Sequence, residues 1–402
     1  MSLKAVYVSA KVKILIIIII ATFFSFGLLS CEDTAHQIEL AGRWSYAFFH
    51  DYKSVPEWEY YADPEGGLVD AVNVNTTLIN GKNYLLLEFH PRSGRNSSRV
   101  FIFDTENPLS PRLVSTIGPK PQENRGLLIN SITVSGNILY AGLFGDKGLW
   151  MADISNPSAP FDLGIAPLEM TSNLVVSGGY AYAMGQMYNG VSIADVADTK
   201  NVREVARIDT VSRECRIAVS GSLLFTGIGR TFTVYDVSTP SSPKQVGYCE
   251  LAVSDNLVTE LPFYQPGEIH WANWASVMDL QTSGNYVYVA FGAGQVRVID
   301  VTTPSTPKEV TATSTSGFAI TLTLQDNLLY LSRSDKDSQK LQMSIIDISQ
   351  PEIPRLLDTV VIESVFGFGG ASYSYCWIRS QVMDDYVYIA GANYMDILKI
   401  QN

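Results

Sequence analysis

The side chains able to act as nucleophiles, bases or metal ligands are few and scattered in this chain. Its four histidines, His36, His50, His90 and His270, show none of the HxxH or HxxxH spacings typical of a zinc site. The four cysteines show no short CxxC spacing, and the chain has no GxSxG, HExxH or P-loop motif. The sequence therefore predicts no metal site, no cofactor and no nucleophilic catalytic site.

Paired carboxylates are the remaining catalytic chemistry to consider. Glycoside hydrolysis requires only two acidic groups about 5–10 Å apart, and long connecting segments of the chain carry several acids. These candidates are Glu57, Glu59, Asp63, Glu268 and Asp279. A carbohydrate-active enzyme, a glycoside hydrolase or a lyase, is therefore the alternative to a protein that only binds.

Aromatic and charged side chains gather in the same connecting segments and suggest a binding surface. Aromatic rings on rigidly mounted loops stack on sugars or serve as protein hot spots, and an opposed Arg and Glu can orient a polar ligand. The structural alternative for each aromatic ring is that the insertion folds back and buries it. For each charged pair, the alternative is a solvated salt bridge that contributes little. The predicted ligand or partner residues are Trp58, Arg125, Arg213, Glu214, His270, Trp271, Trp274, Tyr375, Trp377 and Arg379.

The elements that would position these residues come from a repeated unit. Segments such as Ile132–Ala141 and Leu280–Ala290 alternate apolar and polar residues around Ser-Gly-Asn, which predicts two strands joined by a tight hairpin. A third strand then ends at an Asp that is followed by Ile or Val and by Ser or Thr, or by a close variant of this pair, with prolines four and seven residues after the Asp. This signature starts at Asp104, Asp153, Asp236, Asp300 and Asp347, and a form without the prolines starts at Asp195.

Each part of the signature has a physical role. The Asp side chain accepts hydrogen bonds from the backbone of the turn that follows the third strand. The prolines lead into a fourth strand, which should form the outer edge because proline cannot donate to a ladder. Seven units of four antiparallel strands, each a little over 40 residues, are typical of a β-propeller.

The third strands resemble a known family. Leu149–Asp153, Val191–Asp195, Phe232–Asp236 and Val296–Asp300 are similar to the LVIVD repeat of exported bacterial and archaeal proteins. The resemblance implies a β-propeller over most of the chain and says little about activity.

The chain ends predict how the ring closes. The last unit stops in its third strand at Asn402, and Ile38–Trp44 resembles the missing fourth strand. We therefore expect an all-β, seven-bladed propeller over residues 38–402, closed by an N-terminal strand. Eight blades are the alternative if the insertion after the fourth blade contains a degenerate one.

The N-terminal 30 residues are predicted to be a targeting signal and not part of the folded domain. Three lysines precede an apolar run from Ile14 to Leu29, and Leu28–Cys31 resembles a bacterial lipobox. The resemblance implies cleavage before Cys31, lipidation of its sulfur and a short tether over residues 31–37. An uncleaved membrane anchor is the alternative. Glu32 and Asp33 favour surface display over a periplasm-facing orientation at the outer membrane.

Composition limits the partners. The formal net charge is −12, and loss of the leader with its three lysines lowers it to −15. Such an acidic chain is not expected to bind nucleic acid. Cys215, Cys249 and Cys376 are expected to be free thiols, with a Cys215–Cys249 bridge as the alternative. We expect a monomeric, non-catalytic, lipid-anchored binding or scaffold propeller for a glycan or an envelope protein.

Overall fold

The structure is a computed structural model that describes residues 37–45, 71–90, 97–122, 126–145, 147–185, 190–210, 215–252, 276–292, 294–315, 317–334, 341–362, 379–390 and 394–401. These residues form 28 strands and no helix, and hence no helix able to cross a membrane. Residues 36–401 make up one compact unit. The predicted leader and Cys31 precede the described residues, so the leader, the lipidation and the tether remain predictions.

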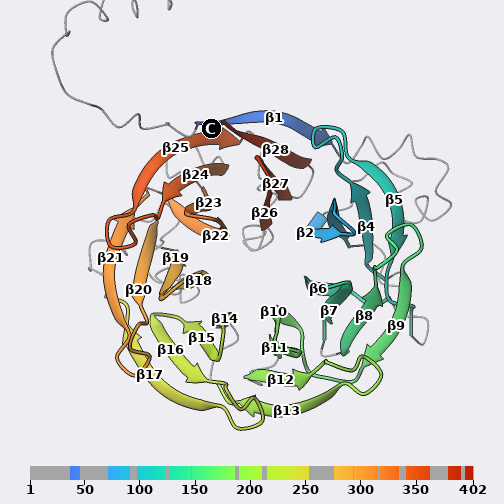
Figure 1. Cartoon of the computed structure of the whole chain (residues 1–402), viewed down its shortest axis with the longest axis horizontal. Coiled ribbons are helices and arrows are strands. Elements are labelled where there is room, and N and C mark those ends of the chain that lie inside the picture. The colour runs from blue at the N-terminus through green and yellow to red at the C-terminus, as the bar shows by residue number, and fades with distance from the viewer. Residues whose placement is uncertain are drawn as a thin grey trace, which may run out of the picture. The chain divides into compact units, whose positions relative to one another are not determined.

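Seven four-stranded antiparallel sheets are arranged around a central axis as the blades of a propeller (Figure 1). Blades 1 to 3 are β2 (Ala71–Ile79), β3 (Lys82–Phe89), β4 (Arg99–Asp104) and β5 (Arg112–Ile117); β6 (Ile129–Ser135), β7 (Ile138–Leu143), β8 (Leu149–Asp153) and β9 (Phe161–Ala166); and β10 (Ser172–Ser177), β11 (Tyr180–Met184), β12 (Val191–Asp195) and β13 (Arg203–Ile208).

Blades 4 to 6 follow the same order. They are β14 (Cys215–Ser220), β15 (Leu223–Ile228), β16 (Thr231–Asp236) and β17 (Lys244–Glu250); β18 (Val277–Ser283), β19 (Tyr286–Phe291), β20 (Gln295–Asp300) and β21 (Lys308–Ser314); and β22 (Phe318–Gln325), β23 (Leu328–Ser334), β24 (Leu341–Asp347) and β25 (Arg355–Ile362). In each blade the first strand lies innermost and the fourth outermost (Figure 1).

Blade 7 closes the ring with both ends of the propeller unit. It consists of β26 (Arg379–Met383), β27 (Tyr386–Ala390), β28 (Tyr394–Gln401) and, as its outer strand, β1 (Gln37–Ser45). The register runs from Gln37 opposite Gln401 to Ser45 opposite Tyr394. The predicted N-terminal closure and the seven-bladed fold are confirmed, and the described strands contain no eighth blade.

The hydrophobic core is divided into seven clusters, one between each pair of neighbouring blades. Between blades 1 and 7, for example, Phe89 and Phe101 pack with Tyr388 and Ile397. Since both faces of a blade are covered, the two middle strands are buried almost continuously, as in the segment Leu341–Ile346 of β24. The long apolar runs in the sequence reflect this double burial.

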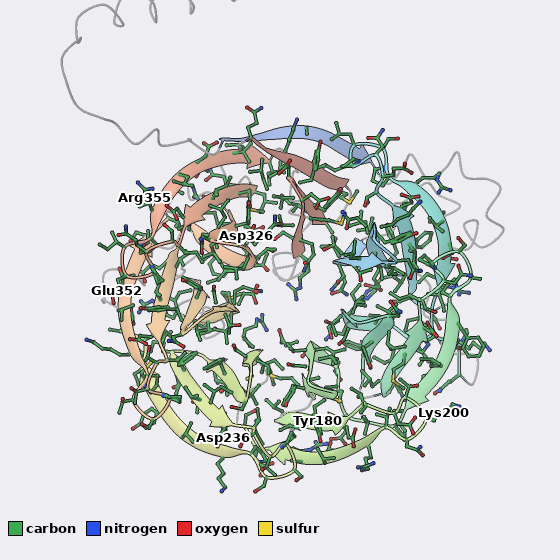
Figure 2. The ribbon with its side chains drawn as sticks, in the orientation of Figure 1. Tyr180, Lys200, Asp236, Asp326, Glu352 and Arg355 are labelled. Atoms are coloured by element: carbon green, nitrogen blue, oxygen red, sulfur yellow. The ribbon has the colours of Figure 1, made fainter. Side chains whose placement is uncertain are left out.

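The Asp signature forms the same turn in six blades. The carboxylates of Asp104, Asp153, Asp195, Asp236, Asp300 and Asp347 each accept a hydrogen bond from the backbone N–H two residues later, at 2.8–3.2 Å. In three blades the other oxygen also binds the arginine at the start of the outer strand, as between Asp347 and Arg355. Lys200, Glu352 and Arg355 lie on the outside of the ring of blades, which we call the outer rim (Figure 2).

Candidate functional site

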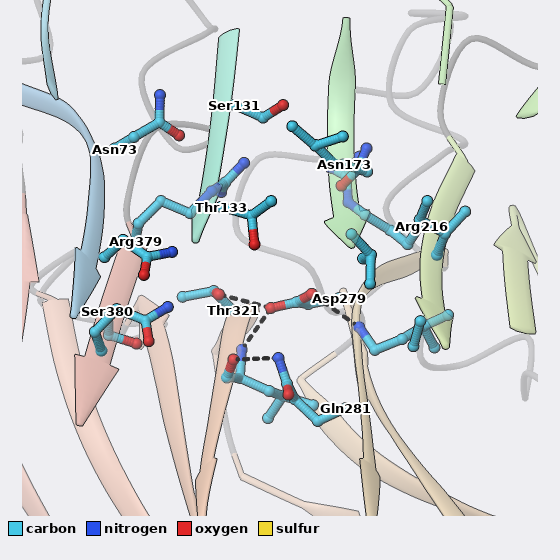
Figure 3. A pocket seen from close by; sticks show the side chains of 18 of the residues that line it. Asn73, Ser131, Thr133, Asn173, Arg216, Asp279, Gln281, Thr321, Arg379 and Ser380 are labelled. Carbon is cyan, nitrogen blue, oxygen red and sulfur yellow. Dashed lines mark hydrogen bonds between the residues drawn. The ribbon is translucent and has the colours of Figure 1, made fainter. Parts of the chain in front are cut away.

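The innermost strands of all seven blades enclose a cavity of about 310 Å³ on the propeller axis (Figure 3). The surface that its walls expose is mainly polar. The cavity is therefore a polar channel and differs from the apolar clusters between the blades.

Near the start of each innermost strand, one polar side chain lines this channel. We call this set the polar ring; its members, from blade 1 to blade 7, are Asn73, Ser131, Asn173, Arg216, Asp279, Thr321 and Arg379. In several blades a β-bulge lies just before the ring position, for example between Val277 and Asp279 and between Ala319 and Thr321. Bulges re-aim side chains, so these breaks in register help to direct the ring residues inward.

Four consecutive ring residues donate a hydrogen bond to a backbone carbonyl of the next blade. Asn73 Nδ2 donates to Asn130 at 3.4 Å, and Ser131 Oγ donates to Thr171 at 3.2 Å. Asn173 Nδ2 donates to Cys215 at 3.0 Å, and Arg216 Nε donates to Met278 at 2.5 Å. The ring therefore joins neighbouring blades as well as lining the channel.

Asp279 reverses the direction of this bonding between blades 5 and 6. Its Oδ2 accepts from Thr321 Oγ1 at 2.7 Å and from the Leu322 backbone N–H at 2.9 Å. Its Oδ1 accepts from the Leu280 backbone N–H at 2.9 Å. Both carboxylate oxygens are thus engaged within the wall (Figure 3).

The charged members give the ring a positive balance. Arg216 and Arg379 lie on opposite sides of the pocket, and Asp279 is the one carboxylate among the described residues that line it (Figure 3). Within the described part of the chain, the structure gives the Arg216 guanidinium one hydrogen bond, from Nε, and no ion pair. The described lining thus carries two guanidinium groups and one carboxylate, a positive balance within a chain of net charge −12.

A buried acid lies behind the ring in blade 1. Glu88 is completely buried; its Oε2 accepts from Asn73 Nδ2 at 3.0 Å, and its Oε1 is 3.4 Å from His90 Nε2. Burial raises the pKa of Glu88, while nearby His90 and the hydrogen bonds from Ser98 and Asn73 oppose that rise. Since His90 Nε2 lies 2.6 Å from the carbonyl oxygen of Ile129, this nitrogen carries a hydrogen and links blade 1 to blade 2.

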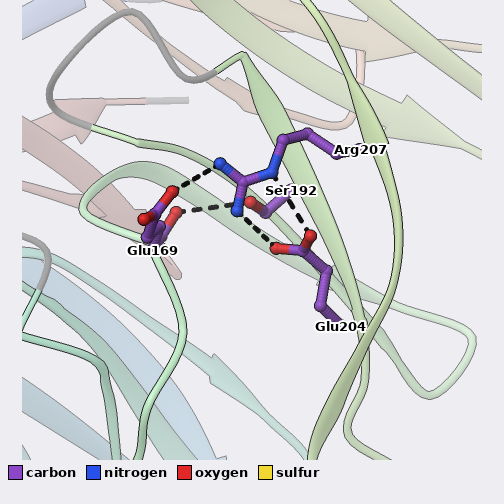
Figure 4. A network of polar contacts seen from close by, with 4 residues as sticks. All are labelled: Glu169, Ser192, Glu204 and Arg207. Carbon is purple, nitrogen blue, oxygen red and sulfur yellow. Dashed lines mark hydrogen bonds and ion pairs between the residues drawn. The ribbon is translucent and has the colours of Figure 1, made fainter.

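A second polar network, in blade 3, is a structural ion pair. Arg207 binds Glu169 and Glu204 at 2.5 and 2.7 Å, and Ser192 Oγ donates to the Glu169 carbonyl (Figure 4). Hydrogen bonds from its guanidinium to Glu204 and Glu169 outweigh burial and raise the pKa of Arg207. Two carboxylates already occupy this arginine, so it does not form a ligand site.

One of the predicted binding residues, Arg379, lies in the polar ring, as does the predicted acid Asp279. The other predicted binding residues lie outside the described residues: Trp58, Arg125, Arg213, Glu214, His270, Trp271, Trp274, Tyr375 and Trp377. The predicted acids Glu57, Glu59, Asp63 and Glu268 also lie outside them. The sequence interpretation missed Asn73, Ser131, Asn173, Arg216 and Thr321.

The two described cysteines are free thiols, so they do not form the alternative Cys215–Cys249 bridge. Burial raises the pKa of the Cys215 thiol to about 12 and that of Cys249 to about 11. Cys376 is outside the described residues. Within the described ranges, no three His, Cys, Asp or Glu side chains are grouped as metal ligands.

Comparison with known families confirms the repeat. The LVIVD repeat matches residues 129–165, 170–210, 213–250, 275–315 and 381–402. These segments correspond to blades 2 to 5 and to part of blade 7. A comparison with curated proteins gave no match.

The solved structures that are similar to this chain have low sequence identity to it. The computationally designed Ika8 protein is 11% identical over 83% of this chain and 98% of its own, with a TM-score of 0.50. A protein from Lactobacillus plantarum is 11% identical over 73% and 85%, with a TM-score of 0.54. A periplasmic gluconolactonase from Pseudomonas aeruginosa is 14% identical over 60% and 69%, with a TM-score of 0.42. Similarity at these identities concerns the fold and carries no functional assignment.

Proposed function

We propose that this LVIVD-repeat propeller is a non-catalytic binding module of the cell envelope that takes part of a glycan into its polar channel. The observation that carries the proposal is the polar ring, in which every blade contributes one hydrogen-bonding side chain to a cavity of about 310 Å³. Amide, hydroxyl and guanidinium groups match the hydroxyls of a sugar. Small-ligand sites commonly combine a preformed concave cavity with a few fixed polar groups.

The predicted aromatic residues extend this proposal to the mouth of the channel. Each innermost strand begins at its ring end, and the segments that enter it carry the aromatic and charged residues. In the chain, Trp377 precedes ring residue Arg379 by two positions, and Glu214 precedes Arg216 by two. We propose that Trp271, Trp274 and Trp377 stack on sugar rings that extend beyond the channel. An envelope protein bound at the same mouth is the alternative partner.

A catalytic role has less support in the described residues. Glycoside hydrolases use two facing carboxylates, whereas the described lining contains Asp279 alone. Moreover, the oxygens of Asp279 accept bonds from Leu280, Thr321 and Leu322. We therefore assign Asp279 to holding the wall, and propose binding without turnover.

A binding assay with matched variants tests the proposal. The soluble chain from Glu32 onward is applied to a glycan array, and each positive glycan is titrated by calorimetry. Thr133→Trp places a large side chain in the channel, while Lys200→Ala on the outer rim is the control. Loss of binding in Thr133→Trp, but not in the control, is expected. Binding by all variants alike, or release of glycan fragments during incubation, would refute the channel or the non-catalytic role, respectively.

The envelope location is tested separately. We propose an outer-membrane lipoprotein, surface-exposed or facing the periplasm, anchored through a lipid on Cys31. Labelling cells with a fatty-acid analogue should mark the full-length chain and leave Cys31→Ala unlabelled. Protease treatment of intact cells then distinguishes the two orientations, and labelling of the Cys31→Ala variant would contradict the anchor.

A further inference from the structure

We infer that the ligand of the channel carries a carboxylate, as in an acidic sugar, and that Arg216 binds this group. The inference deepens the proposed glycan-binding function and depends on it. It identifies a specificity-determining residue and the chemical class of the ligand.

Arg216 has more hydrogen-bond donors than its contact with the next blade uses. Its Nε alone makes the bond to the Met278 carbonyl that joins blade 4 to blade 5. Ser131 and Asn173 make the equivalent bonds with a hydroxyl and an amide. The two Nη groups of Arg216 therefore exceed what the blade contact requires, and among the described residues the structure gives them no partner.

Asp279 is the acid in the neighbouring ring position. An Asp beside an Arg would normally neutralise it through an ion pair. Here Asp279 directs its oxygens to Leu280, Thr321 and Leu322, and the described residues contain no ion pair between it and Arg216. The carboxylate holds blade 6, and the cation keeps its capacity for an external anion.

The Arg216 guanidinium matches a carboxylate in geometry and charge. With Nε fixed on a backbone carbonyl, the plane of the Arg216 guanidinium is oriented, and its remaining donors form a fork suited to two oxygens. The nearby lining of Asn173, Thr133 and Gln281 supplies amide and hydroxyl groups. A sugar ring with one carboxylate satisfies both parts, since its hydroxyls and its anion find different partners in the same cavity.

Calorimetric titration of the soluble chain from Glu32 onward separates this inference from the proposed function. The probes are glucuronate, glucose, glucose 6-phosphate and inorganic phosphate, each with wild type, Arg216→Gln, Arg216→Lys and the rim control Arg355→Gln. A charge-assisted hydrogen bond contributes about 1.5–3 kcal/mol, so Arg216→Gln should weaken glucuronate binding about 10–100-fold. Arg216→Lys should restore only part of the affinity, because it keeps the charge without the fork. Glucose should bind more weakly and be insensitive to Arg216.

Each of the other possible results refutes either the carboxylate-binding role of Arg216 or the proposed glycan-binding function. Equal affinities for glucuronate and glucose, unaffected by Arg216→Gln, refute the carboxylate and leave the glycan-binding function standing. Arg216-dependent binding of the two phosphate probes without glucuronate overturns the acidic sugar in favour of a phosphate ligand. Binding of neither sugar, together with a blank glycan array, refutes the proposed function itself. If Arg216→Gln does not fold, the salt dependence of wild-type binding decides, because the affinity for glucuronate, unlike that for glucose, must fall as ionic strength rises.

Discussion

Replacing Asp104 by alanine should destabilise the propeller by about 1–2 kcal/mol, whereas replacement by asparagine should cost about 0–1 kcal/mol. Asp104 is 7% exposed and ends the third strand of blade 1. One carboxylate oxygen accepts from the Glu106 N–H at 2.9 Å, and the other from Arg112 at 2.9 Å. Alanine removes both bonds, while asparagine keeps an oxygen for the backbone N–H.

The magnitude follows from the two bonds taken separately. The bond to the Glu106 N–H is analogous to a helix N-cap, whose removal costs about 1 kcal/mol. The ion pair with Arg112 contributes only about 0–1 kcal/mol, because the Arg112 side chain is 70% exposed and its charge is screened by water. The backbone bond is therefore expected to dominate the loss.

Urea unfolding of the soluble chain at neutral pH, followed by circular dichroism, measures the effect. Asp347→Ala and Asp347→Asn repeat the comparison in blade 6, where the same two bonds go to Ser349 and Arg355. Glu352→Ala, on the same rim, is the control and should change stability by less than about 0.5 kcal/mol. If alanine and asparagine destabilise equally at both positions, the turn bond is not the source of the stability, and the assigned role of the Asp signature is wrong.

Three further predictions concern pH and packing. The hydrogen bond from the Ser155 N–H lowers the pKa of Asp153. The ionised Asp153 therefore stabilises the fold above its ordinary pKa near 3.8, and this stabilisation is lost as the pH falls through the lowered pKa. Asp153→Asn should weaken this acid dependence of stability, as measured by urea titrations at several pH values. Burial raises the pKa of Glu88, so stability should fall as the pH rises from about 4.5 through the raised value; Glu88→Gln should remove that fall, and an unchanged profile of melting temperature against pH would contradict it. Gly142→Ala would place a Cβ 2.4 Å from the Thr171 carbonyl oxygen between blades 2 and 3, so it should cost about 1–3 kcal/mol or more in urea unfolding.

The fold could be predicted because its determinants are local and repeated. The Asp turn, the prolines before the outer strands and the hairpins each depend on a few adjacent residues. Pro160 directly precedes β9 and Pro354 directly precedes β25, as expected for edge strands. Closure by β1 was also predictable, since the last unit lacks a fourth strand and a ring leaves no free edge.

The residues of the polar ring could have been predicted from their position in the sequence, but the sequence interpretation considered only the loops. Ser131, Asn173, Arg216, Asp279 and Thr321 each lie four residues before the last residue of their strand, next to the hairpin. Once the innermost strand is known, alternation places that position on the channel side. Counting back from each hairpin would therefore have found these residues.

Other features depend on contacts between blades and have no local signal. The engagement of Asp279 requires Thr321 and Leu322 of the next blade, whose position depends on the ring geometry. Glu88 is a further example: it lies in the strand Lys82–Phe89, and no neighbouring residue in the sequence marks it as the completely buried acid that the structure shows. Such assignments need the packed arrangement, since the partners are far apart in the chain.

The distribution of function in this propeller follows from what each repeated position must do. The Asp of the turn recurs in six blades because each blade needs the same backbone bond. The polar ring, by contrast, changes its residue from blade to blade, although four of its members donate a comparable bond to the next blade. A serine is sufficient for that bond at Ser131, so a guanidinium at Arg216 supplies charge and donors beyond the structural requirement. Among the described residues the structure gives the two Nη groups of Arg216 no partner, so we expect these excess donors to bind an anionic group of the ligand.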